Sequence, residues 1–286
     1  MTCFLPRCFA RRQCTLGGLV SENPGYLPFM AVVRLSVVII TFNEEANIAR
    51  CLQALGDVAD EVLVVDSFST DRTVEICQQH GARVVQNAFA GYVEQKNFAT
   101  DQARFDYVLQ LDADEVLTDE LRQSISTAKH NWQHAAYSLA RLTNYCGSWV
   151  RHGGWYPDRK LRLYDRRLGR WEGLLLHEHY EVQPGHSTGQ LQGDALHYSY
   201  HSIAQHVNQL NKFTSITAQE LALKGKIKVT LFHLVLKPLW KFWHGYVFRL
   251  GFLDGFAGLS IAIISALGVF LKFAKLKTGT QNAPTA

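Results

Sequence analysis

The sequence lacks the cysteine and histidine patterns that mark disulfide-rich proteins and zinc proteins. Its 286 residues include six cysteines, without the regular spacing that builds a disulfide framework. Neither an H-E-x-x-H motif nor a pair of C-x-x-C motifs occurs, and these are the usual sequence signatures of zinc sites. These absences favour a reducing compartment and argue against a zinc centre.

The start of the chain also lacks the continuous apolar segment of a secretory signal peptide. Residues 1–29 are rich in arginine, cysteine, glycine and proline, and they follow neither a helical nor a strand period. Met30 directly precedes the first strand-like run. We therefore expect residues 1–29 to be disordered or a mis-annotated extension, with translation beginning at Met30.

Short apolar runs alternate with helical patterns in the part of the chain that follows. The strand-like runs cover residues 35–40, 61–65, 82–86 and 107–111, and the helical patterns cover residues 46–55, 72–80 and 92–103. Near-continuous apolar strands that alternate with helices predict a parallel sheet with crossover helices. Ligands on such a sheet bind at the carboxyl ends of its strands.

Two carboxylates, Asp112 and Asp114, stand one residue apart at the end of the last of these strands. Because a strand alternates its faces, both side chains would point the same way. Like charges this close repel one another unless a cation or a proton lies between them. A divalent cation, Mg²⁺ or Mn²⁺, held by carboxylates and by substrate phosphates satisfies this requirement. The alternative is a solvated acidic turn.

Four motifs in this order resemble the nucleotide-sugar domain of the inverting family 2 glycosyltransferases. They are VVIITFNE at 37–44, VDSFSTDRT at 65–73, QKN at 95–97 and LDADE at 111–115. More narrowly, the chain looks like bacterial lipopolysaccharide core glucosyltransferases that extend an inner-core heptose, and the tail motif GFLDGFAG at 251–258 strengthens that match. The resemblance covers about residues 34–277. It implies an α/β GT-A (Rossmann-like) fold, a mostly parallel sheet flanked by helices, with a C-terminal helical membrane-associated extension.

The resemblance also implies roles for residues in the first two loops. Thr41, Asn43 and Glu44 should line the nucleotide base and ribose of the donor, and Asp66 should contact the uracil or the ribose. Asp71 or Thr70, in the same loop as Asp66, could instead cap the following helix.

Further roles fall on the third and fourth motifs. Lys96 should lie near the base or the diphosphate, although it could instead be a solvated helix lysine, and a lysine lacks the bidentate fork of arginine. Asp112 should contact the ribose and the metal, and Asp114 should be the more direct metal ligand.

An inverting transfer needs a carboxylate that does not bind metal, because the acceptor hydroxyl is a weak nucleophile until a base takes its proton. The resemblance favours Glu178 as this base. Glu172, Asp158 and Glu181 are the alternatives.

Arginine and aromatic residues are concentrated between residues 149 and 171. Aromatic faces stack on sugar rings, and arginines bind phosphates through two parallel hydrogen bonds. We expect Arg162 to contact the nucleotide sugar and Trp155 to contact the acceptor. Nucleic-acid binding would use the same residue types, but the net charge is only +4 and no nucleic-acid module is visible.

Acidic residues are almost absent from residues 224–277, where Asp254 is the only one. Lysines and aromatic residues interleave there, which suits an interfacial helix on an anionic leaflet. Residues 255–270 are uncharged but fall short of the ~20 residues that a spanning helix needs. We expect peripheral or monotopic attachment to the cytoplasmic face of the bacterial inner membrane; a true span and a hydrophobic dimer interface are the alternatives.

The sequence therefore predicts four segments: the extension at 1–29, a GT-A domain over 30–200, a helical membrane-associated tail over 201–277 and a disordered C-terminus at 278–286. The expected reaction transfers a sugar from a UDP-sugar to a lipopolysaccharide inner-core heptose with the help of Mg²⁺ or Mn²⁺. The sugar we expect is glucose. The alternatives are a polyprenyl-phosphate or other envelope glycan acceptor, or a non-catalytic scaffold that binds sugar nucleotides.

Overall fold

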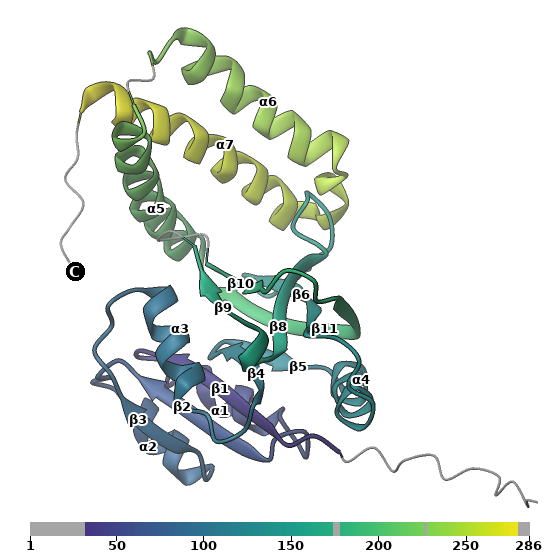
Figure 1. Ribbon diagram of the computed structural model, residues 1–286. Helices are drawn as coiled ribbons and strands as arrows, with labels where there is room; N and C mark the ends of the chain where they lie inside the picture. The colour runs from purple at the N-terminus through teal and green to yellow at the C-terminus, as the bar shows by residue number, and fades with distance from the viewer. Residues whose placement is uncertain (1–31, 174–177, 226–227, 280–286) are drawn as a thin grey trace, which may run out of the picture. The chain divides into compact units, whose positions relative to one another are not determined.

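The computed structural model describes residues 32–173, 178–225 and 228–279 (Figure 1). The predicted N-terminal extension at 1–29 lies outside the described residues, as do residues 280–286 of the predicted C-terminal segment.

The first half of the main sheet is parallel, as predicted. Its strands are β1 (Leu35–Thr41), β2 (Glu61–Asp66), β3 (Arg83–Gln86) and β4 (Tyr107–Asp112), in the spatial order β3-β2-β1-β4. Leu35, Val37, Val38 and Ile39 of β1 are completely buried because helices cover both faces of this half. The apolar runs of the sequence therefore gave the strands to within about one residue at each end.

The carboxyl ends of these strands meet at one edge of the sheet. β1 pairs with both β2 and β4, so that Thr41 lies opposite Asp66 and Ile40 lies opposite Asp112. The crossover helices are α1 (Ile48–Gln53), α2 (Thr73–Gln79) and α3 (Tyr92–Asp101). All three were expected, but α1 is shorter than predicted because a turn closed by the Glu44 carbonyl occupies the residues before Ile48.

The second half of the sheet is mixed, so the prediction of a mostly parallel sheet holds for the first half. It continues in the order β4-β8-β6-β11-β5, with β7 beside β6. These strands are β5 (Glu115–Leu117), β6 (Ala136–Tyr145), β7 (Ser148–Val150), β8 (Asp158–Asp165) and β11 (Thr188–Tyr200). β6 turns back into β7 through Cys146 and Gly147, both at positive φ, and such short connections produce antiparallel neighbours.

Three smaller elements complete this part of the fold. Helix α4 (Asp119–His130) follows β5, and its first residue is preceded by Thr118, whose side chain accepts a hydrogen bond from the Leu121 backbone. β9 (Gly169–Glu172) and β10 (His179–Val182) form a separate antiparallel pair.

The tail consists of helices that pack against one another. They are α5 (Ile203–Leu223), α6 (Lys237–Trp243), which is continued at both ends by π-helical turns, and α7 (Gly255–Thr278). α5 and α6 both lie alongside α7 (Figure 1). Gly268 of α7 lies at the contact with α5, where a Cβ would come within 2.6 Å of the end of the Leu210 side chain and would displace it.

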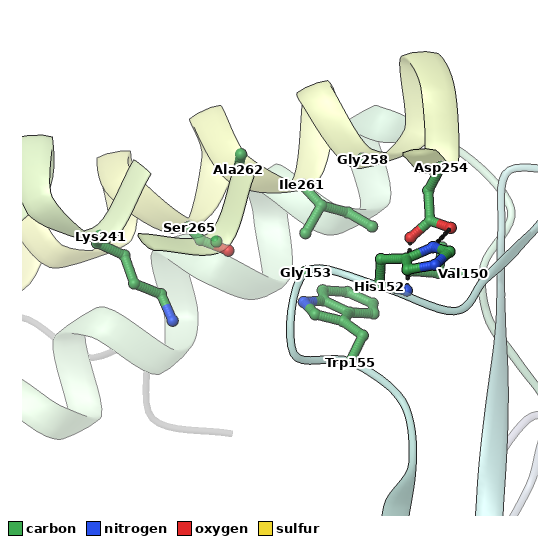
Figure 2. Close-up of a pocket in the computed structure, with 11 residues that line it drawn as sticks. Val150, His152, Gly153, Trp155, Lys241, Asp254, Gly258, Ile261, Ala262 and Ser265 are labelled. Atoms are coloured by element: carbon green, nitrogen blue, oxygen red, sulfur yellow. Dashed lines mark hydrogen bonds and ion pairs between the residues drawn. The ribbon is translucent and has the colours of Figure 1, made fainter. Parts of the chain in front are cut away.

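Asp254 connects the tail to the sheet. Its carboxylate accepts hydrogen bonds from the backbone N–H groups of Arg151 (3.1 Å) and His152 (2.8 Å), and it lies 2.8 Å from Nδ1 of His152. Figure 2 shows this contact beside the start of α7, with Trp155 below Ile261. Trp155, the predicted acceptor contact, packs here against a cluster that includes Tyr145 and Ile261. The only acidic residue of residues 224–277 thus has a structural role.

The residues Gly251–Thr278 form a segment long and apolar enough to cross a membrane, by length and composition alone. It is longer than the uncharged stretch at 255–270 because lysines are included at its end. That end is attached to α5: Nζ of Lys275 donates to the backbone and side-chain oxygens of Asn211 and to the hydroxyls of Thr214 and Ser215, at 2.7 to 2.9 Å.

Candidate active site

A cavity of about 1410 Å³ lies at the carboxyl ends of β1 and β4. Two exposed aromatic residues of the loop before α3 and its first turn, Phe89 and Tyr92, form part of its wall. Six of the predicted site residues line it: Thr41, Glu44, Lys96, Asp112, Asp114 and Glu178. The convergence of these side chains from separate loops makes this cavity the candidate active site.

Asp112 is surrounded by cations from three other elements. Nη2 of Arg162 lies 2.7 Å from its Oδ2, Nζ of Lys96 lies 3.5 Å from its Oδ1, and a terminal nitrogen of Arg141 lies 3.7 Å from its Oδ2. Burial by itself would raise the pKa of Asp112, but attraction by Arg162, Lys96 and Arg141 holds it well below its usual range. Asp112 is therefore ionised at every physiological pH.

Glu115 forms the completely buried centre of this network. Its carboxylate accepts hydrogen bonds from the Asp112 backbone N–H (3.1 Å) and from Arg141 (3.3 Å), and it lies 3.7 Å from Arg162. Burial would lower the pKa of Arg141, but Glu115 and Asp158 raise it instead. The sequence pointed to neither Glu115 nor Arg141 as part of the site.

Asp114 faces His197 on β11, another residue that sequence reasoning missed. Nε2 of His197 lies 3.2 Å from Oδ2 of Asp114. Burial would lower the pKa of His197, whereas the hydrogen bond and the charge of Asp114 raise it. No local motif marks this histidine, because β11 reaches the site only through its pairing with β5 and β6.

Lys96 is almost completely buried and lies between two carboxylates. Its Nζ is 3.1 Å from Oε1 of Glu178 and 3.5 Å from Oδ1 of Asp112, and it stands 4.6 Å from the centre of the Trp171 ring. It is therefore not the solvated helix lysine that the sequence left open. Lys96 fixes the spacing between Glu178 and Asp112.

Among the four carboxylates considered as the catalytic base, Glu178 lies in the cavity wall. Asp158 is paired with Arg141 and with Lys160, and Glu172 and Glu181 are more than half exposed on β9 and β10. Position in the cavity thus favours Glu178.

The remaining predicted site residues lie outside the wall of this cavity. Asn43, at a positive φ of 54°, accepts a hydrogen bond from the Thr70 backbone and so connects the loop after β1 to the loop after β2. Asp66 accepts one from the Ser69 backbone, within the loop after β2. Asp71 accepts from the backbone of Thr73, the first residue of α2, which agrees with its alternative role as a cap.

Arg162 is nearly buried, at 3% exposed, and its guanidinium reaches Asp112 and Glu115. Trp155 packs beside α7 (Figure 2). The contacts of both side chains are thus with the protein itself.

The residues at the strand ends fit a divalent cation only in part. Asp114 and His197 offer a carboxylate oxygen and an imidazole nitrogen side by side, and both are common metal ligands. Among the described residues, no group of three or more His, Cys, Asp and Glu side chains could hold a metal by itself. A cation here would need substrate phosphate oxygens and water to complete its ligands, as Mg²⁺ commonly does.

The buried network makes a prediction about stability. Arg162→Met should lower the free energy of unfolding by roughly 3 kcal/mol or more, because Asp112 and Glu115 lose a buried counter-charge. Arg170→Met is the matched control, since Arg170 is 70% exposed and should change stability by less than about 0.5 kcal/mol. Urea unfolding of both variants measures the difference, and equal stabilities would contradict the importance of this network.

Comparison with known proteins gives a family. Residues 36–181 match the family described as Glycosyl transferase family 2. A glycosyltransferase of Rickettsia typhi is 36% identical over 254 residues, which cover 85% of this chain and 87% of that protein. The lipopolysaccharide core biosynthesis glycosyltransferase LpsC of Rhizobium meliloti is 29% identical over 250 residues, which cover 85% of this chain and 91% of LpsC.

Solved structures are similar over parts of the chain. Glucosyl-3-phosphoglycerate synthase from Mycobacterium tuberculosis, in complex with Mn²⁺, UDP and glucosyl-3-phosphoglycerate, is 24% identical with a TM-score of 0.34, and the match covers 39% of this chain and 44% of the synthase. TarS of S. aureus is 16% identical with a TM-score of 0.39, and the match covers 87% of this chain and 83% of that one.

Proposed function

The chain belongs to glycosyl transferase family 2, and from this premise we propose that it transfers glucose from UDP-glucose to a heptose of the lipopolysaccharide inner core. The observation that carries the proposal is the cavity in which Glu178 and the pair Asp112 and Asp114 come together. The likeness to LpsC, which acts in lipopolysaccharide core biosynthesis, supports the acceptor class.

The donor would bind at the strand ends of β1 and β4. Thr41 and Glu44 line the cavity where the base and ribose of the nucleotide would lie, and Asp112 and Asp114 border the position of the diphosphate. A divalent cation bound by Asp114 and His197 would neutralise the charge that develops on the leaving diphosphate.

Glu178 would act as the base. In a single displacement, the acceptor hydroxyl oxygen forms a bond to the anomeric carbon, the bond from that carbon to the diphosphate oxygen breaks, and the hydroxyl proton moves to Glu178. The configuration at the anomeric carbon is inverted. Lys96 keeps the Glu178 carboxylate oriented before the reaction, because its ammonium lies 3.1 Å away.

Glu178→Gln tests the assignment of the base. The variant should lower kcat by roughly two to four orders of magnitude, the range for loss of a general base, with the Kd of UDP-glucose nearly unchanged. Glu181→Gln is the control, since Glu181 is exposed on the neighbouring strand. Wild-type turnover by Glu178→Gln, with loss of turnover on substitution of Asp158 or Glu172, would reassign the base.

Asp114→Asn tests the cation. The variant should lose most transfer activity and should also bind Mn²⁺ more weakly in the presence of UDP, measured by electron paramagnetic resonance. EDTA should reproduce the loss of activity in the wild type. His197→Ala should weaken Mn²⁺ binding as well, whereas Asp119→Asn, on the exposed start of α4, should not. Full activity in excess EDTA would show that the proposed reaction does not require the cation.

We further propose that the tail attaches the enzyme to the membrane without crossing it. Most of the large exposed hydrophobic residues of the described chain lie in residues 231–270, and large exposed apolar surfaces mark sites of membrane or protein contact. They are Leu231, Phe232, Val235, Leu236, Leu239, Trp240, Trp243, Val247, Phe248, Leu250, Phe252, Leu253, Phe256, Ile263, Leu267 and Phe270. Lys237, Lys241 and Lys272 lie among them and suit anionic headgroups.

The attachment of α7 to α5 argues against a span. α5 carries Gln, Asn, Lys and Glu side chains along its length, and Lys275 holds it to the far end of α7. If α7 crossed the bilayer, these polar groups would enter the hydrocarbon with it, at a cost of several kcal/mol for the charged ones. An orientation in the plane of the interface leaves α5 in water and the exposed apolar residues in lipid.

A labelling experiment distinguishes the two orientations. In a cysteine-depleted chain, Lys277→Cys at the end of α7 and Gln123→Cys on α4 should react alike with a membrane-impermeant maleimide, both only after the inner membrane is opened. Detergent, but not high salt, should release the protein, because salt does not screen the hydrophobic contribution. Labelling of position 277 in intact spheroplasts would show that α7 spans the membrane.

A further inference from the structure

One wall of the cavity is formed by a helix of the tail. Gln205, Asn208, Gln209 and Lys212 of α5 line the cavity opposite the strand ends. Their spacing of three and four residues places them on one face of the helix. This face was not among the predicted site residues.

The opposite face of α5 is occupied by contacts with the rest of the protein. His206 is buried against Tyr145, with 2.9 Å between its Nδ1 and the tyrosine hydroxyl. Leu210 meets α7 at Gly268, and Thr214 accepts a hydrogen bond from Lys275. The helix is thus fixed by one face, and the other is presented to the cavity.

The side chains on the cavity face are suited to hydroxyl groups and to an anion. The amides of Asn208 and Gln209 can both donate and accept hydrogen bonds, and neither side chain forms one with another described residue. The other lysine and arginine side chains of the cavity wall are paired, Lys96 with Glu178 and Arg141 with Glu115. Lys212 makes no ion pair with any described residue, and it is exposed.

We propose that this face of α5 is an acceptor subsite, in which Asn208 and Gln209 bind sugar hydroxyls and Lys212 binds a phosphate substituent of the acceptor saccharide. This inference rests on the proposed function. The inference extends the proposed function, because it specifies a phosphate substituent on the acceptor saccharide.

The position of Lys212 favours the acceptor over the donor. α5 runs from the end of β11 into the tail (Figure 1), and Lys212 lies nine residues, or about 14 Å, along it from Ile203. The diphosphate of the donor belongs at the strand ends with Asp112 and Asp114. An acceptor held at the membrane would enter from the side of the tail and pass this face of α5.

The test compares full-length variants in detergent with two acceptors. One is a heptose-terminated core oligosaccharide that carries phosphate, and the other is the same oligosaccharide after removal of the phosphate. Lys212→Gln should raise the KM for the phosphorylated acceptor about ten-fold, the effect of one lost charge-assisted contact. The KM for the dephosphorylated acceptor should change less than about two-fold. Lys212→Arg should restore most of the affinity, and Asn208→Ala should raise the KM for both acceptors.

Lys224→Gln is the matched control, because Lys224 is an exposed cation at the end of α5 that does not line the cavity. The Kd of UDP-glucose should stay the same in all variants. An unchanged acceptor KM in Lys212→Gln would overturn the subsite, and an equal rise in the Kd of UDP-glucose would assign this face to the donor. A loss confined to undecaprenyl phosphate as acceptor would also overturn the assignment to a saccharide.

Equilibrium binding separates failure of the subsite from failure of the proposed function. Absence of transfer from every UDP-sugar by the wild type would refute the function. Binding of the phosphorylated oligosaccharide in the presence of UDP, measured by calorimetry, tests the subsite without depending on sugar transfer. A wild type that does not bind it, or a Lys212→Gln variant that binds it equally well, overturns the subsite.

Discussion

The site depends on the neutralisation of carboxylates that the fold brings to one edge of the sheet. Asp112 and the completely buried Glu115 repel one another, and desolvation by itself would raise the pKa of Asp112. Arg141 and Arg162, from β6 and β8, and Lys96 from α3 supply the opposite charge. Strands β6 and β8 of the second half of the sheet are thus required electrostatically by the parallel half, because they carry the two arginines.

Lys96 connects the two sides of the cavity on which the proposed reaction depends. A lysine that touches both Asp112 and Glu178 links the side of the cavity where a donor would bind to the side where an acceptor hydroxyl would lose its proton. The ring of Trp171 covers one side of the ammonium, which limits its movement. A rigid spacing between base and donor is what a single displacement needs, since the reacting atoms must approach to about 3 Å.

The sequence predicted what is encoded locally. The strands of the parallel half are continuous apolar runs, and the D-x-D pair ends one of them, so their residues were identifiable from pattern alone. Arg141 and His197 were not, because each lies in an ordinary strand and reaches the cavity through pairings distant in sequence. The burial of Lys96 was equally hidden, since Glu178 lies 82 residues away. Arg162 and Trp155 stood out by composition, but composition does not show whether such side chains face a ligand or the protein.

Helix α5 belongs both to the tail and to the wall of the cavity, and so joins the two. A helix that only attached α7 to the sheet would need a single apolar face, yet α5 is polar on the side that borders the cavity. Asp254 and Lys275 fix α7 at its two ends, one to the loop after β7 and the other to α5. The position of α5 against the cavity therefore depends on the same helix that carries four of the exposed apolar residues, Phe256, Ile263, Leu267 and Phe270. A membrane that binds α6 and α7 would in this way also set the direction from which an acceptor approaches Glu178.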